Sequence, residues 1–172
     1  MSEARTALLE TVMAYVAEHG MSDLSLREIA VGADTSHRML IYHFGSREGL
    51  VAAIAAAVEA DQRQVLATLA ESATDPGEVI RALWAQVSDP ALRPFVRLFF
   101  EVLAHAFHGR PGTEGFLDSL TEPWVEQAVE IAERLGVGRS VDDIRLGVAV
   151  TRGLLIEVLA TDDAGPATAS LE

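Results

Sequence analysis

The stretch that decides the fold is LREIAVGADTSHRMLIYHFGSREGL, residues 26–50. Ser25 precedes it and Glu28 lies three residues later, which is the spacing of a capping box at a helix start. A break follows at residues 32–35, and Thr35 or Ser36 can cap a second short helix that runs to Phe44. We therefore expect two short helices joined by a tight turn.

Longer helices are expected on both sides of this pair. Apolar residues recur at helical spacing from Leu8 to Val16, and Gly20 is a typical stop signal. Ser46 can cap a helix from Arg47 to about Leu69 or beyond; its apolar face is Leu50, Val51, Ile54, Val58, Val65 and Leu69. Two short helices braced by longer ones form a helix-turn-helix scaffold, whose second helix enters the DNA major groove.

The surface of the second short helix distinguishes a helix-turn-helix from an ordinary bundle of three packed helices. Leu40 and Phe44 lie four residues apart and can both face a core. The remaining side chains then point elsewhere, leaving an exposed polar and aromatic surface: Ser36, His37, Arg38, Met39, Tyr42 and His43. A purely structural helix rarely needs such a surface, so the pattern favours the helix-turn-helix.

Residues 26–36 (LREIAVGADTS) and 39–50 (MLIYHFGSREGL) resemble the DNA-binding domain of the TetR family of transcriptional regulators. The resemblance is detailed over about residues 5–55, and the rest of the chain is similar only in helical layout. It implies an all-α chain with an N-terminal three-helix helix-turn-helix DNA-binding domain at residues 1–48. Residues 49–172 then form a C-terminal helical bundle for ligand (effector) binding and dimerisation.

Three positions depart from the family pattern. Asp34 stands where the family usually has Gly, at a turn where a left-handed backbone is expected; Asp tolerates that region better than most residues. Arg38 adds a cation where the family often has a small residue. Ile41 replaces the family's usual phosphate-contacting Tyr, so Tyr42 next to it is expected to take over that contact.

The expected DNA contacts divide by chemistry. Arg38 can pair bidentately with guanine O6 and N7, although it could instead be a solvated surface charge. Ser36 and His37 at the helix N-terminus can reach base edges or phosphates, and Met39 can contact a thymine methyl or tuck against the first helix. The residues expected on phosphates are Tyr42, His43 and Arg47.

Helical patterns continue at about residues 77–87, 92–108, 113–135 and 141–160, with Pro123 expected to kink or split the third. The tail from Asp162 to Glu172, rich in small residues, is expected to be frayed. No strand alternation is found, which predicts an all-α fold of eight or nine helices.

Aromatic residues gather in the second part of the chain. They are interpreted as an effector pocket or as ordinary core packing. The expected effector-binding residues are Trp84, Phe95, Phe99, Phe100, His105 and Trp124. Glu101, His105 and His108 have helical spacing suited to a shared metal, but also to effector contact or to solvated, capping roles. Nothing else completes a ligand set, so neither a metal nor a cofactor is expected.

Charge and composition limit the partners. The chain has 172 residues, 26 acidic and 13 basic, and every basic residue is Arg. The net charge of −13 excludes a nonspecific coat on nucleic acid, but residues 1–48 carry four Arg against seven acids, a net charge of only −3. There is no cysteine, no signal peptide and no apolar run of membrane length, so we expect a cytoplasmic protein without a membrane partner.

The last two helices, about 122–135 and 141–160, carry more apolar surface than one small core needs, which predicts a homodimer. A dimer would place two recognition helices on a palindromic DNA operator. The expected function is a repressor that a small, largely apolar effector releases from its operator. Because no catalytic motif is found, an enzyme is not expected; the alternative is a helical ligand-binding sensor or enzyme that no longer binds DNA.

Overall fold

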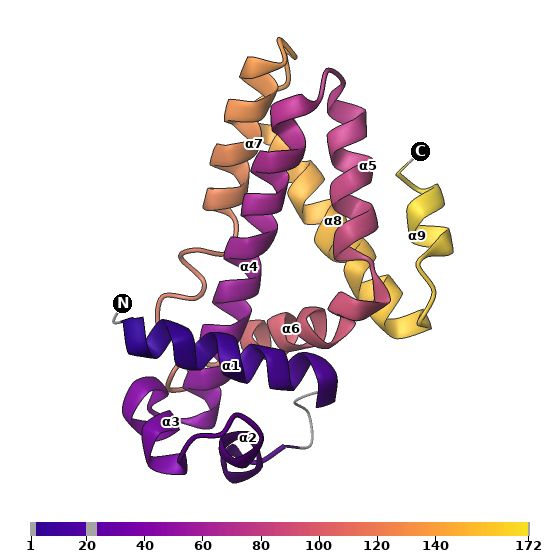
Figure 1. Cartoon of the computed structure of the whole chain (residues 1–172). Coiled ribbons are helices and arrows are strands. Elements are labelled where there is room, and N and C mark those ends of the chain that lie inside the picture. The colour runs from indigo at the N-terminus through magenta and orange to yellow at the C-terminus, as the bar shows by residue number, and fades with distance from the viewer. Residues whose placement is uncertain (1–2, 20–23, 172) are drawn as a thin grey trace. The chain divides into compact units, whose positions relative to one another are not determined.

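The structure, a computed structural model, describes residues 3–19 and 24–171 (Figure 1). In chain order the elements are α1 (Glu3–His19), α2 (Leu26–Gly32), α3 (His37–Phe44), α4 (Arg47–Ser72), α5 (Pro76–Val87), the 3-10 helix η1 (Pro90–Leu92), α6 (Arg93–Phe107), α7 (Glu122–Arg134), α8 (Val141–Thr161) and α9 (Gly165–Ala169). The described residues thus contain nine α-helices and no strand, which confirms the all-α prediction. None of these helices is both long and apolar enough to cross a bilayer.

Three serines fix the starts of the helices that the sequence analysis singled out. The predicted capping box forms: Ser25 Oγ accepts from the Glu28 backbone N–H at 3.3 Å, and the Ser25 N–H donates to the Glu28 carboxylate at 2.8 Å. Ser36 Oγ accepts from the Met39 N–H at 3.2 Å, and Ser46 Oγ accepts from the Gly49 N–H at 3.0 Å. The predicted stop at Gly20 lies outside the described residues.

The chain divides into two compact units. The first contains residues 1–58 and 94–116, and the second contains residues 59–93 and 117–172. The first unit has a core contributed by all three N-terminal helices and by the start of α4: Leu9, Val12, Val16, Ile29, Ala30, Leu40, Phe44, Leu50, Val51 and Ile54. Burying each large apolar side chain contributes about 1.5–3 kcal/mol, so this shared core holds short helices that could not persist alone.

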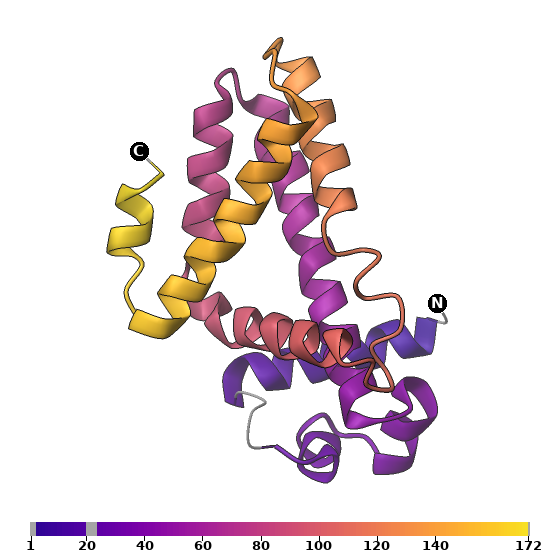
Figure 2. The ribbon, with the colours of Figure 1, turned by 180° about the vertical axis from the view of Figure 1, so that it is seen from behind.

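The second unit is built around two apolar clusters. In the first cluster, Leu66 and Ala70 of α4 pack with Val79 of α5. In the second, Trp84 of α5 packs with Val158 of α8 and Ala167 of α9. Helices α7 and α8 pack side by side in this unit (Figure 2).

The prediction of a helix beginning at residue 113 is wrong. Gly109, Gly112 and Gly115 have positive φ angles of 61°, 90° and 75°, a backbone conformation that an α-helix cannot contain. The helix instead begins at Glu122 with Pro123 in its first turn, where the missing proline N–H costs no hydrogen bond. Pro123 therefore starts α7 rather than kinking a longer helix.

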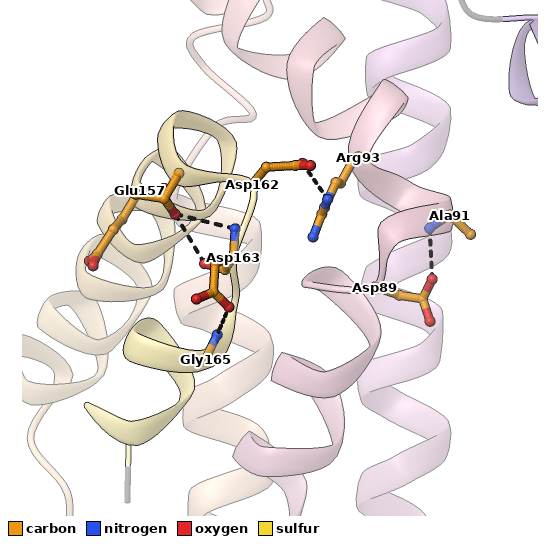
Figure 3. Close-up of polar contacts among 8 residues, drawn as sticks. Asp89, Ala91, Arg93, Glu157, Asp162, Asp163 and Gly165 are labelled. Carbon is orange, nitrogen blue, oxygen red and sulfur yellow. Dashed lines mark hydrogen bonds and ion pairs between the residues drawn. The ribbon is translucent and has the colours of Figure 1, made fainter.

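The prediction of a frayed tail is also wrong, because residues 165–169 form α9. Asp162 turns the chain with a left-handed φ of 59°, and Asp163 accepts from the Gly165 N–H at 2.8 Å (Figure 3). Ala167 is completely buried, and Trp84 Nε1 donates to Thr168 Oγ at 2.8 Å. A helix this short is stabilised by docking rather than by its own propensity.

We predict that Thr168→Val lowers the free energy of unfolding by about 1–2 kcal/mol, because it leaves the buried Trp84 N–H without an acceptor. Denaturant unfolding measures this loss. Thr68→Val, which removes only an exposed hydroxyl bonded to the Gln64 carbonyl, is the control and should cost less than about 0.5 kcal/mol. Equal costs for the two variants would show that α9 does not depend on this hydrogen bond.

Candidate functional site

Helix α3 is fixed by two buried side chains on one face and by a contact from α1 at its C-terminal end. Leu40 and Phe44 are 1% and 8% exposed, as the four-residue spacing predicts. Arg5 of α1 donates from Nε to the His43 carbonyl at 3.2 Å, and its guanidinium lies 4.9 Å from the Phe44 ring centre. Two apolar anchors and one cation therefore fix the orientation of α3.

The turn before α3 has the left-handed residue that the sequence analysis expects. Asp34 has a φ of 48°, and the next residue, Thr35, donates its N–H to the Ala30 carbonyl at 2.8 Å. Gly45, with a φ of 77°, ends α3. Aspartate thus occupies the position where glycine is commoner, and the turn keeps its shape.

The outer face of α3 presents the predicted contact residues. Met39 and Tyr42 are 42% and 78% exposed, and His37 and Arg38 are also exposed. His43 is half-buried, with its ring edge-on to Tyr42 at 4.9 Å. Ser36 serves as the helix cap. A rigid helix that displays a guanidinium, a thioether and a phenol has the donors and the apolar groups needed in a DNA major groove.

Arg47 is held within the first unit by a carboxylate from α6. Its Nη1 lies 3.2 Å from Glu101 Oε1, and its Nε donates to the Leu24 carbonyl at 3.4 Å. About 30% of each side chain of the pair is exposed: 28% for Arg47 and 32% for Glu101. This partner was not predicted, because the spacing of Glu101 groups it with His105 and His108 instead. The phosphate role of Arg47 stays a prediction.

The predicted effector residues fall into separate groups. Phe95, Phe99, Phe100 and His105 all lie on α6 in the first unit; the Phe99 ring packs edge-on against Phe100 at 5.2 Å. The two tryptophans lie in the second unit. Trp84 belongs to the cluster around Val158, whereas Trp124 packs against the cluster around Leu66.

His105 of α6 and His108, which follows the end of that helix, belong to no group of described residues that is placed to hold a metal. Among the described residues, no group of three His, Asp or Glu side chains is placed to hold an ion. Glu101 is engaged with Arg47 instead. The role of His105 in effector binding stays a prediction.

A cavity of about 450 Å³ lies in the second unit between the start of α7 and α8. Its lining is Leu117, Asp118, Thr121, Glu122, Arg145, Ala149 and Arg152. Arg145 donates to both carboxylate oxygens of Glu122, at 2.7 and 3.0 Å, and this contact lowers the pKa of Glu122. The sequence analysis assigned no role to these residues, because the two arginines lie on a helix that it interpreted as apolar.

Residues 8–54 match the sequence profile described as "Bacterial regulatory proteins, tetR family". The matched segment contains α2, α3 and the turn between them, together with most of α1 and the start of α4. Over these residues the chain is similar to the TetR family of regulators. No sequence among the curated proteins matches it.

Solved structures of TetR-family and related regulators share the fold over nearly the whole chain. A putative transcriptional regulator from Rhodococcus sp. RHA1 is similar with a TM-score of 0.76 and 20% identity, covering 98% of this chain and 93% of that one. A TetR-family regulator from Pectobacterium atrosepticum has a TM-score of 0.71 and 21% identity, covering 98% and 88%. FadR of Thermus thermophilus, a TetR-family repressor in complex with lauroyl-CoA, has a TM-score of 0.63 and 18% identity, covering 97% and 89%.

We predict that Glu101→Gln tightens DNA binding by about two- to fivefold, because the carboxylate competes with DNA phosphate for Arg47. An ion pair this exposed is worth only about 0.2–1 kcal/mol, which sets that range. Fluorescence anisotropy with a fixed DNA duplex measures the affinity. In an Arg47→Ala background the same substitution should have no effect; an equal gain there would show that Glu101 acts through general charge repulsion.

Proposed function

We propose that the chain is a dimeric repressor that binds a palindromic operator through α3 and is released by a small, largely apolar effector. The observation that carries this proposal is the outer face of α3, where exposed Arg38, Met39 and Tyr42 project from a helix fixed by buried anchors. An exposed apolar and aromatic surface on a soluble domain is typical of a binding face.

The roles on DNA follow from side-chain chemistry. Arg38 pairs with a guanine, and Met39 packs on a thymine methyl next to it. Ser36 and His37, at the helix N-terminus, reach base edges or the nearest phosphates. Tyr42, His43 and Arg47 position the domain on the backbone without reading sequence.

The charge of the chain sets the character of this binding. All 13 cations are Arg, the side chain that pairs bidentately with guanine and phosphate. With a net charge of −13, few phosphates can be neutralised. Nonspecific binding is therefore weak, and its dependence on salt is shallow.

The dimer is proposed to form through α7 and α8. Leu146, Val150 and Ile156 of α8 are 63%, 44% and 53% exposed, and added Cβ atoms at Gly147 and Gly153 would meet open space. Apolar side chains beside small residues let two helices approach closely. A second copy of the chain covers this face with an identical one, in a twofold arrangement.

The proposed domain boundary is functional and differs from that of the compact units, because residues 49–58 and 94–116 belong to the first unit. Residues 1–48 bind DNA, and residues 49–172 bind the effector and form the dimer. The effector favours a state of the dimer in which the two α3 helices are wrongly spaced for the operator. It can do this only if it binds that state more tightly than the DNA-binding state. The lauroyl-CoA complex of FadR supports an effector with an apolar body. Trp84 and Trp124 of the second unit are proposed to contact it. For Phe95, Phe99, Phe100 and His105, which lie in the first unit, effector contact stays a prediction.

We predict that Arg38→Ala weakens binding to a matched operator by about 1–3 kcal/mol and relaxes base preference at one position. Arg47→Ala should weaken binding evenly across sequences and lower the salt slope by about one. Titration of both variants against matched and scrambled duplexes measures these effects. Uniform losses for both variants would refute the division between base-reading and phosphate contacts.

We predict that Val150→Arg converts the dimer into a monomer, because it places two like charges at a twofold apolar contact. Sedimentation velocity measures the mass. Ile80→Arg on α5, where the native side chain is 53% exposed, is the matched control and should leave the mass unchanged. A Val150→Arg protein that stays dimeric would place the interface on another face.

A further inference from the structure

The face of α4 that packs within the second unit contains two polar residues, Glu59 and Gln62. Its buried positions in the second unit include Gln62, Leu66 and Ala70, which are 9%, 6% and 1% exposed. Glu59 lies one turn before Gln62 on the same side of the helix, and 22% of its side chain is exposed. A helix that packs only through apolar contacts has no need for an amide and a carboxylate at these positions.

Gln62 has an unpartnered atom. Its Oε1 is buried and accepts no hydrogen bond from the described part of the chain. A buried acceptor without a donor destabilises the folded protein, and such atoms are rare in native structures. The position therefore indicates a missing hydrogen-bond donor.

Glu59, beside Gln62 on α4, is engaged through one carboxylate oxygen. Trp124 Nε1 donates to Glu59 Oε2 at 2.6 Å, and Arg152 Nη2 lies 3.9 Å from the same oxygen. Burial raises the pKa of Glu59 and lowers that of Arg152, so both charges lie where water stabilises them only in part.

We propose that Glu59 and Gln62 form the polar end of the effector site and take a neutral compound with an apolar body and hydroxyl or N–H donors. The inference rests on the proposed function, since it names the ligand of the same regulatory domain. Gln62 Oε1 is a buried acceptor that lacks a donor, which the compound supplies, and the partly exposed Glu59 carboxylate beside it is a second acceptor. Trp124, already fixed by its bond to Glu59, offers an aromatic wall for the apolar body.

The charges around Glu59 favour a neutral compound over a cation. Arg152 and Arg63 both lower the pKa of Glu59, which means that their positive charges already act on its carboxylate. The Arg63 guanidinium also lies 5.9 Å from the Trp124 ring centre. A ligand cation would meet these two guanidiniums, whereas a hydroxyl can use the acceptors without that repulsion.

Arg152 joins these acceptors to the cavity described above. It lines the cavity, and its guanidinium donates to the Leu120 carbonyl and, at 3.1 Å, to Thr121 Oγ. The same guanidinium faces Glu59. Arg152 therefore lies between the cavity and the polar end of the site.

The test uses three probes of similar size with the full chain. p-Cresol is neutral and has an O–H donor, p-methylanisole replaces that hydrogen by a methyl group, and benzylammonium is a cation. Isothermal titration calorimetry with the unaltered chain measures each dissociation constant. We expect p-cresol to bind about tenfold or more tightly than p-methylanisole, the difference expected for a hydrogen bond to a charged group. Equal affinities, no saturable p-cresol binding, or tighter benzylammonium binding would each overturn the proposal.

A matched pair of variants locates the site. Gln62→Leu should raise the melting temperature, because it removes the unpartnered buried acceptor, and should weaken p-cresol binding by about fivefold or more. Gln64→Leu, the same change at an exposed position two residues along α4, should leave both measurements unchanged. Equal effects of the two variants would overturn the assignment of Gln62.

DNA binding separates this inference from the proposed function. If p-cresol binds with the expected Gln62 dependence and leaves DNA affinity unchanged, the site stands and effector-controlled release fails. If DNA is released by other compounds while Gln62→Leu affects none of them, the regulatory function stands and the site assignment fails.

Discussion

The packing of Leu40 and Phe44 against the N-terminal core is the constraint on which the proposed DNA-reading surface of α3 depends. Helix α3 has eight residues, too few to be stable alone, so its orientation comes from these two side chains. Arg5 adds a hydrogen bond at the C-terminal end, and Ser36 caps the start. With both ends and one side fixed, Arg38, Met39 and Tyr42 are displayed as a rigid set, and little ordering entropy remains to be lost on binding.

The ion pairs of the two units differ in how far they are exposed to water. In the first unit, Glu101 holds Arg47 at a partly exposed position, where the ion pair is weak and can be exchanged for a phosphate. In the second unit, Glu59 and Arg152 are more deeply buried and only 3.9 Å apart, so each depends on neighbouring donors and acceptors. The first arrangement suits a contact that is made and broken on DNA. The second suits recognition of a ligand that supplies the missing hydrogen bonds.

The parts of the fold that follow from local chemistry could be predicted from the sequence. Ser25, Ser36 and Ser46 cap their helices because their partners lie three residues away, and Leu40 and Phe44 face inward because of their spacing. The contacts that were missed join distant residues: Arg47 with Glu101, and Trp84 with Thr168. Docking of Trp84, which no local pattern shows, is what orders α9. Glu59 and Gln62 could have been found, because polar residues that continue the stripe of Val51 and Ala55 are an anomaly visible in the sequence.

The central proposal is that two copies of α3, held at a fixed separation, read an inverted repeat. Selection of bound duplexes from a random pool by the full chain tests it most directly. The account predicts enrichment of two inverted half-sites whose centres lie about 10 base pairs, or a multiple of that, apart. Each half-site should contain a guanine that is no longer enriched when the selection is repeated with Arg38→Ala. Failure to enrich any sequence, or enrichment of a single unsymmetrical site that is unchanged by Arg38→Ala, would contradict it.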